Sequence, residues 1–199
     1  MKAITAMGLT LAGLALAMPA AAQQQPPDTG WRMPYESNFW GHAGISAGEA
    51  QIDGLNCLPG TGCDDAAGHI RAYAGGRFNN AFGMEVGVMN FGNFTINGGE
   101  ADGWGLDFAL VAGLPIGANS AVFAKAGFVY SDMQVGASAI GYPTGSEGGF
   151  GPRLGIGGQV GLSKNWALRA DFDRYRLDFP GGREEDIDAI TLGVQYTFR

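Results

Sequence analysis

The sequence predicts an all-β fold in which eight antiparallel strands close into an up-and-down barrel. Almost no segment shows the apolar spacing of a helix over three turns, whereas many segments alternate apolar with small or polar residues. The chain also contains 35 glycines among 199 residues. Glycine within strands is tolerated where a sheet curves sharply or where interior space is tight, and a small closed barrel requires both.

The strands follow one another with the same period of two. Seven are expected, in chain order, over residues 39–51, 69–78, 84–93, 105–115, 121–133, 153–162 and 166–173. The eighth covers 190–198 and alternates most strictly, because its large apolar residues are separated by Thr191, Gly193, Gln195 and Thr197. Successive side chains point to opposite faces of a strand. Each segment therefore has one apolar face and one small or polar face.

Short and long connections alternate along the chain. The short turns are expected at residues 79–82, 116–119 and 163–165. The long loops, which are rich in glycine, serine, proline and charge, are expected at residues 53–67, 93–103, 132–151 and 178–186. Since connections in an up-and-down barrel alternate between its two ends, all four long loops should lie at one end.

The N-terminal residues favour export from the cytoplasm. Lys2 precedes an apolar run that ends in small residues, which is typical of a secretory signal peptide cleaved between Ala22 and Gln23. A membrane anchor is the alternative, but the run is short for a helix that spans a bilayer. The expected organisation is a signal peptide over 1–22, a short segment over 23–37 and one barrel domain over 38–199. Loss of Lys2 takes the formal charge from −7 to −8, which excludes a general nucleic-acid binder.

Charged residues indicate which face is the interior. They gather on the glycine-rich face, where the expected interior polar network consists of Glu85, Asp107, Lys125, Gln159, Arg169 and Asp171. In a soluble barrel the apolar face forms the core, whereas in an outer-membrane barrel it contacts lipid. The signal peptide, the one-sided long loops and strands of about ten residues favour the outer membrane. The aromatic residues expected to form girdles at the membrane surfaces are Trp40, Trp104, Tyr130, Trp166, Tyr196 and Phe198.

Several segments carry a family resemblance. They are residues 75–87, 112–116, 123–127 and 165–172, and the C-terminal pattern of Thr191, Gly193, Tyr196 and Phe198. Together they resemble, at matching intervals, the OmpA-like transmembrane domain, a family of eight-stranded outer-membrane barrels. The resemblance implies that the C-terminal pattern is read by the outer-membrane assembly machinery, and that outer-membrane lipids and lipopolysaccharide surround the barrel. No segment matches the peptidoglycan-binding domain of longer members, and Arg199 departs from the aromatic residue on which members commonly end.

The resemblance also implies an ion pair inside the barrel. A carboxylate on the third strand and an arginine on the seventh match Glu85 and Arg169. A second family pair falls on Val111 and Gln159, which are both neutral, so no buried charge loses its partner. The partners open to Lys125, which matches an interior cation of the family, are Asp107, Glu85 and Asp171. An eight-stranded barrel has room only for its own side chains, so any conductance should be small.

The two cysteines, Cys57 and Cys63, both belong to the first long loop. In an oxidising compartment, a pair at this spacing in a loop rich in glycine and proline predicts a disulfide. A metal site is the alternative, but it needs further cysteine or histidine ligands, and only His69 is close in sequence. We therefore expect no metal site and no cofactor.

These features predict a small structural or surface-interaction protein of the outer membrane, and the loop sequences do not identify its extracellular ligand. Two alternatives remain, a narrow channel and an enzyme that modifies lipid A. The enzyme needs a nucleophile, a histidine base and an acid close together. His42 and His69 are the only histidines, so no catalytic residue is assigned. Residues 183–186 either bind divalent cations that bridge lipopolysaccharide phosphates or are simply solvated.

Overall fold

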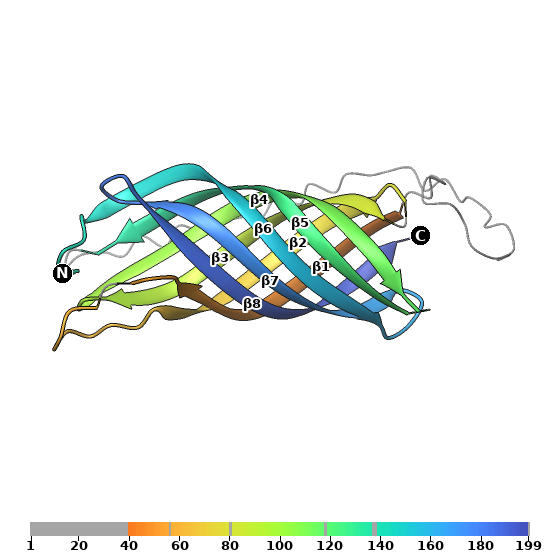
Figure 1. The fold of residues 1–199 in the computed structure, drawn as a ribbon, viewed down its shortest axis with the longest axis horizontal. Coiled ribbons are helices and arrows are strands. Elements are labelled where there is room, and N and C mark those ends of the chain that lie inside the picture. Colours follow the sequence, from red (N-terminus) through yellow and green to blue (C-terminus); the bar gives the residue numbers. More distant parts are fainter. Residues whose placement is uncertain (1–39, 56, 80, 118, 137–138, 199) are drawn as a thin grey trace, which may run out of the picture. The chain divides into compact units, whose positions relative to one another are not determined.

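The structure, a computed structural model, describes residues 40–198 apart from residues 56, 80, 118 and 137–138. Its strands are β1 (Trp40–Ile52), β2 (Ala66–Arg77), β3 (Phe82–Ile96), β4 (Gly99–Ile116), β5 (Ser120–Val135), β6 (Gly145–Gly161), β7 (Trp166–Phe179) and β8 (Arg183–Phe198). Each strand pairs antiparallel with the next, and β8 pairs with β1 to close the barrel (Figure 1). The eight-stranded fold is therefore confirmed. No helix in the described ranges is long and apolar enough to cross a membrane.

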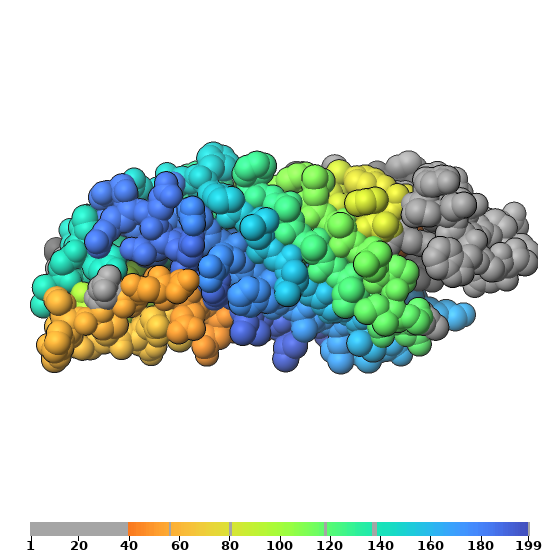
Figure 2. Space-filling model, viewed as in Figure 1, coloured from red at the N-terminus to blue at the C-terminus, as the bar shows by residue number. Residues whose placement is uncertain are grey.

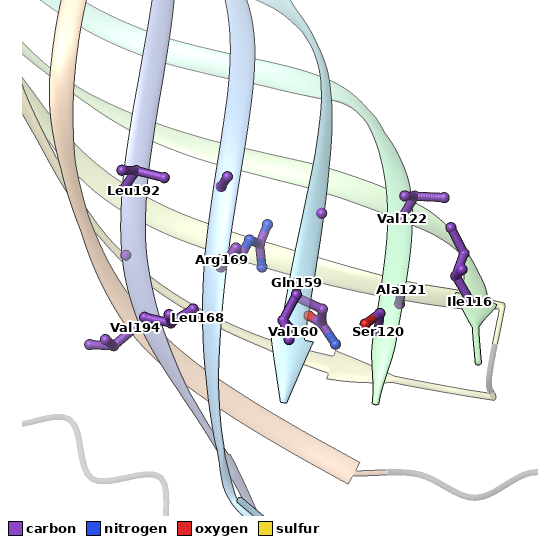
Figure 3. A pocket seen from close by; sticks show the side chains of 13 residues that line it. Ile116, Ser120, Ala121, Val122, Gln159, Val160, Leu168, Arg169, Leu192 and Val194 are labelled. Atoms are coloured by element: carbon purple, nitrogen blue, oxygen red, sulfur yellow. The ribbon is translucent and has the colours of Figure 1, made fainter. Parts of the chain in front are cut away.

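Side chains alternate between the outside and the interior of the barrel. On β4, Leu106 and Leu110 are exposed, whereas Asp107 between them is buried. On β7, the consecutive residues Leu168 and Arg169 likewise project from opposite faces of the strand (Figure 3). The outer surface is thus a band of large apolar side chains around a charged interior. This arrangement is the reverse of a soluble barrel and is the one expected in an outer membrane.

The apolar band is hollowed in several places, one of them beside Gly158 and Ala170. One cross-strand row of the wall contains Val122 on β5, Gly158 on β6, Ala170 on β7 and Leu192 on β8. The two middle residues of this row are small. The result is a shallow outward-facing groove of about 650 Å³ between the larger side chains of β5 and β8 (Figure 3).

The strands at the long-loop end are longer than the sequence indicated. β4 has 18 residues and β6 has 17, so most of the segments expected as loops at 93–103, 132–151 and 178–186 are strand. Glycine and charge in these segments suggested loops, but the segments are strands that continue beyond the apolar band. On β4, for example, Glu100 and Asp102 occupy outward positions and Gly99 and Gly103 occupy inward ones. The actual connections at this end are residues 53–65, 97–98, 136–144 and 180–182, which we call the cap.

A bulge adjusts β3 where it leaves the apolar band. The register between β3 and β4 shifts between Asn90 and Asn93. Gly92 within this bulge has a φ of 72°, and a Cβ there would lie 2.2 Å from the backbone oxygen of Gly68. Only glycine fits this position, because both the backbone conformation and the close approach of β2 exclude a side chain.

The interior at the long-loop end is apolar, which corrects the expectation of a polar interior throughout. The buried cluster consists of Ala50, Ile52, Ala67, Met89, Phe91, Phe94, Ile96, Ala101, Val129, Met133, Val135, Ala139, Tyr175, Leu177, Phe179, Ile187 and Ala189. We call this set the apolar plug. Apart from Ala139 of the cap, its members occupy inward positions of the strands. They give the projecting part of the barrel a core like that of a soluble protein.

Aromatic residues at the two ends of the band form clusters rather than complete girdles. At the long-loop end, the ring of Tyr130 lies 6.1 Å from Trp104 and 5.0 Å from Phe150, between centroids. At the short-turn end, the ring of Tyr196 lies 5.0 Å from Trp166 and 5.1 Å from Phe198. The two clusters occupy different strands, β4 to β6 and β7 to β8.

Candidate functional site: the barrel interior and its cap

The charged half of the interior centres on Glu85 and Arg169. Arg169 donates through Nη1 to Oε1 of Glu85 at 2.7 Å and through Nη2 to Oε2 at 2.9 Å. Neither side chain is accessible to solvent. Gln195 accepts a further hydrogen bond from Arg169, and the Nε2 atom of His42 lies 3.2 Å from Glu85 Oε1. β3 and β7 thus bring together the two residues that the family resemblance pairs.

Lys125 pairs with one of its three expected partners and with one carboxylate that the sequence reading missed. Its Nζ lies 2.5 Å from Asp171 and 2.7 Å from Asp173. Asp171 also accepts hydrogen bonds from Arg169, which joins this pair to the one at Glu85. Consecutive inward positions on β7 therefore supply Arg169, Asp171 and Asp173 to one network.

Two further arginines extend the network towards the apolar plug. Arg71 forms a two-pronged pair with Asp107, at 3.0 and 2.9 Å. Arg153 pairs with Asp107 and, at 3.0 Å, with Asp173. The sequence reading left Arg71, Arg153 and Asp173 out of the network, although all three occupy inward positions on predicted strands. The alternation of side chains along each strand places all three on the same face as the predicted interior residues, and this signal would have identified them.

The side chains of the network occupy the charged half of the barrel interior and are buried there. Removing one partner from a buried ion pair leaves an uncompensated charge and destabilises a protein strongly. In the complete network each charged member has a partner of opposite charge. Gln159 lies at its edge, with only a long contact of 3.5 Å to Gln195. His69 stacks on Phe91 with ring centroids 5.3 Å apart, where the charged half meets the apolar plug.

At the long-loop end, the cap is organised around Asn97. The Oδ1 atom of Asn97 accepts a hydrogen bond from the backbone N–H of Leu58 at 2.9 Å, and its Nδ2 donates to the carbonyl of Ile140 at 3.1 Å. Asn97 is buried and has a φ of 47°, a conformation that asparagine tolerates better than most residues. One side chain therefore ties together three of the four cap segments. No sequence feature singled it out.

The first cap segment contains the disulfide between Cys57 and Cys63. Next to it, the hydroxyl of Thr61 donates to the carbonyl of Leu58 at 2.8 Å. The backbone of this segment also binds the 97–98 turn, because the N–H of Gly98 donates to the carbonyl of Gly62 at 2.7 Å. The disulfide thus fixes the shape of a segment that is already docked on its neighbour.

The remaining cap contacts close a ring of segments. The guanidinium of Arg183 lies 4.8 Å from the ring centroid of Tyr142. Burial raises the pKa of Tyr142 above its ordinary value, and the negative charge of Glu185 raises it further. The N–H of Asp53 donates to the carbonyl of Asp186 at 2.8 Å. This bond joins the first cap segment to the beginning of β8. In Figures 1 and 2 these segments gather at one end of the barrel.

On the outside of β7 and β8, charged pairs lie directly above the apolar band. Arg174 contacts Asp188 at 2.5 Å and Asp53 at 3.1 Å, and Arg176 contacts Asp186 at 2.8 Å. The acidic run at 183–186 is therefore partly neutralised by arginine. Among the residues that the structure describes, no group of three or more histidine, cysteine or carboxylate side chains is arranged to hold a metal ion.

The other residues singled out from the sequence are distributed as follows. Thr191 is buried in the interior, and Gly193 follows at the next inward position on β8. Tyr196 and Phe198 of the C-terminal pattern pack together on the outside. Three of the expected features lie outside the described residues. They are the expected signal peptide over 1–22, its expected cleavage pair Ala22 and Gln23, and the expected segment over 23–37.

Comparison with known proteins gives the same architecture. Residues 8–198 match the family model described as "Outer membrane protein beta-barrel domain". The chain is 25% identical to Outer membrane protein A of Serratia marcescens over 214 residues, covering 99% of this chain and 56% of that protein, so it spans little more than half of the relative's length.

Solved structures of barrels resemble the fold at low sequence identity. Neisserial surface protein A has a TM-score of 0.62 and 12% identity, covering 80% of this chain and 97% of that one. The attachment invasion locus protein Ail of Yersinia pestis has a TM-score of 0.53 and 18% identity, covering 79% and 99%. The family match, the inverted distribution of side chains and the closed strand order agree, and the chain belongs to the outer membrane protein beta-barrel domain family as an integral protein of the outer membrane.

Proposed function

We infer that the chain is a closed outer-membrane barrel whose role is structural and surface-directed, with the cap as its interacting part. The observation that carries this inference is the filling of the described interior in both halves. Charged side chains form ion pairs across one half of the barrel interior, and the apolar plug occupies the other half. A barrel filled in this way gives solutes no route and instead supports the cap rigidly.

A channel is the less favoured alternative. Polar interiors line water-filled pores, whereas the apolar plug places buried Phe94, Leu177 and Ile187 across the interior. Rearrangement of the Glu85–Arg169 pair leaves these side chains in place. The plug therefore argues against a conduction pathway that a change at the charged pair alone would open.

An enzymatic role has little support. His42 is held beside Glu85, and His69 packs against Phe91 and Tyr175 within the barrel. Neither histidine has a serine or cysteine partner among the contacts of the described residues. A lipid A enzyme would need a nucleophile, base and acid together at the membrane rim.

The proposed surroundings of the barrel are outer-membrane lipids and lipopolysaccharide, which the apolar band and the groove beside Gly158 and Ala170 would contact. The proposed partner of β8 is the assembly machinery, through Thr191, Gly193, Tyr196 and Phe198. The extracellular ligand belongs to the cap. The relative Ail is known in complex with the heparin analogue sucrose octasulfate. The charged side chains of the cap are all acidic, namely Asp53, Asp64 and Asp65, and they do not suit a polyanion.

A deletion strain tests the proposal. We would restore either the full chain or a variant in which cap residues 55–63 and 139–143 are replaced by short glycine-serine linkers. Heat-dependent gel mobility would confirm that both barrels assemble to equal levels, and detergent and dye entry would report envelope integrity. Rescue by the full chain alone is expected. Equal rescue by the two proteins would assign the function to the barrel and overturn the role of the cap.

A further inference from the structure

We propose that the cap is a docking site for a basic polypeptide segment that carries apolar side chains. This inference rests on the proposed surface role and names the chemistry of the partner. It starts from two apolar side chains at the tip of the cap. Leu58 is 44% exposed and Ile140 is 57% exposed, although both lie outside the lipid-facing band.

The same side chain holds both residues in place. Asn97 accepts from the N–H of Leu58 and donates to the carbonyl of Ile140, so two apolar side chains from different loops flank one buried carboxamide. Ile140 is fixed a second time, because its N–H donates to the carbonyl of Asn97 at 3.4 Å. All of these bonds use backbone atoms of Leu58 and Ile140, so the backbone of each residue is held while its side chain stays exposed.

Rigid support beneath the pair adds to the case for binding. Cys57, which precedes Leu58, is fixed by its disulfide to Cys63. Leu55 and Tyr142, near the two exposed residues in sequence, pack against the apolar plug. A surface that is already ordered loses little conformational entropy when a partner binds, so a small exposed apolar pair can contribute measurable affinity.

Charge determines the class of partner. Carboxylates lie on the first cap segment and on the strand ends that adjoin the other three, and they are Asp53, Asp64, Asp65, Glu100, Asp102, Glu147, Glu184, Glu185 and Asp186. The cations of the same region are Arg174 and Arg176, which are paired with carboxylates, and Arg183, which lies over Tyr142. The excess of negative charge attracts a basic partner and repels an acidic one. Together the apolar pair and the acidic field fit a segment with both lysine or arginine and aliphatic or aromatic residues.

Binding of synthetic peptides tests the proposal directly. The full chain would be placed in nanodiscs of zwitterionic lipid, with protein-free nanodiscs as the reference for membrane binding. Three peptides of equal length would be compared, composed of lysine and leucine, of lysine and serine, and of glutamate and leucine. We expect specific binding of the lysine-leucine peptide, weaker binding of the lysine-serine peptide, and a loss of affinity as salt increases.

A double variant locates the site. Leu58→Ser with Ile140→Ser leaves the backbone bonds to Asn97 available. The double substitution should lower the affinity for the lysine-leucine peptide by about tenfold, because it removes a small central apolar contact. Gln134→Ser, an exposed residue of β5 outside the cap, is the matched control and should leave affinity unchanged.

Three results would overturn the docking site: no binding of the lysine-leucine peptide beyond the empty nanodisc, preference for the glutamate-leucine peptide, or equal binding by the double variant. These results are distinguishable from failure of the proposed function, because envelope rescue by the cap is measured without any peptide. If the cap is needed for rescue and the peptide does not bind, the surface role stands and the partner class is wrong.

Discussion

Glu85 and Arg169 are 84 positions apart in sequence and form a two-pronged ion pair inside the barrel, with nitrogen-oxygen distances of 2.7 and 2.9 Å. Arg169 also holds Asp171, which in turn contacts Lys125. One arginine therefore joins the carboxylates contributed by β3 and β7. The stability of the charged half of the interior depends on this side chain more than on the exposed charged pairs outside.

Arg169→Met should strongly destabilise the barrel. The substitution leaves Glu85 and Asp171 buried with a cation fewer, and breaking a buried pair in this way costs about 3–5 kcal/mol. The free energy of unfolding, measured by urea titration in detergent or lipid, checks this result. Arg176→Gln is the control, because its pair with Asp186 is exposed on the outside and should contribute little. Equal effects of the two substitutions would contradict the importance of the interior network.

Asn97→Gly should loosen the cap without unfolding the barrel. Glycine accepts the φ of 47° without strain, so the substitution removes the side-chain bonds of Asn97 to Leu58, Thr61 and Ile140 without straining the backbone. Hydrogen exchange of the Leu58 amide should become faster, and proteolysis near residues 139–144 should increase. Unchanged exchange at Leu58 would show that Asn97 does not hold the cap segments together.

Replacement of Cys57 and Cys63 by serine should have a small effect on global stability. The disulfide closes a short loop, and short loops gain less from cross-linking than long ones. The cap contacts of Thr61 and Gly62 should persist, with faster hydrogen exchange confined to the first cap segment. Thermal unfolding and hydrogen exchange of the oxidised protein and the serine variant would be compared. A large loss of global stability would contradict this assignment.

Tyr142 should make the barrel less stable at alkaline pH. Burial raises the pKa of its hydroxyl above the ordinary value of about 10, so the folded protein keeps the proton longer than the unfolded chain does. The contribution of this group is present below pH 10 and is lost as the pH rises through the folded pKa. The pH dependence of unfolding above pH 10 should be flatter in Tyr142→Phe. Identical profiles for the two proteins would exclude this contribution.

The sequence predicted the barrel and the inverted distribution of side chains, because alternation is visible within single strands. It predicted the Glu85–Arg169 pair, which joins β3 and β7, through the family resemblance. It did not choose Asp173 for Lys125, since that choice depends on how β5 and β7 are staggered on either side of β6. Asn97 escaped notice because its partners come from two other loops. Phe94 and Leu177 were missed as part of a core, since the glycines and charges around them indicated loops.

Single-channel recording in planar bilayers tests the closed interior most directly. The wild-type barrel, with insertion verified by heat-dependent gel mobility, should give no stable conductance steps. Arg169→Ala should also give none, because buried Phe94, Leu177 and Ile187 still fill the other half. Discrete ohmic steps from the wild-type protein would contradict the account, since ions would then be passing through a region that the structure fills with apolar side chains.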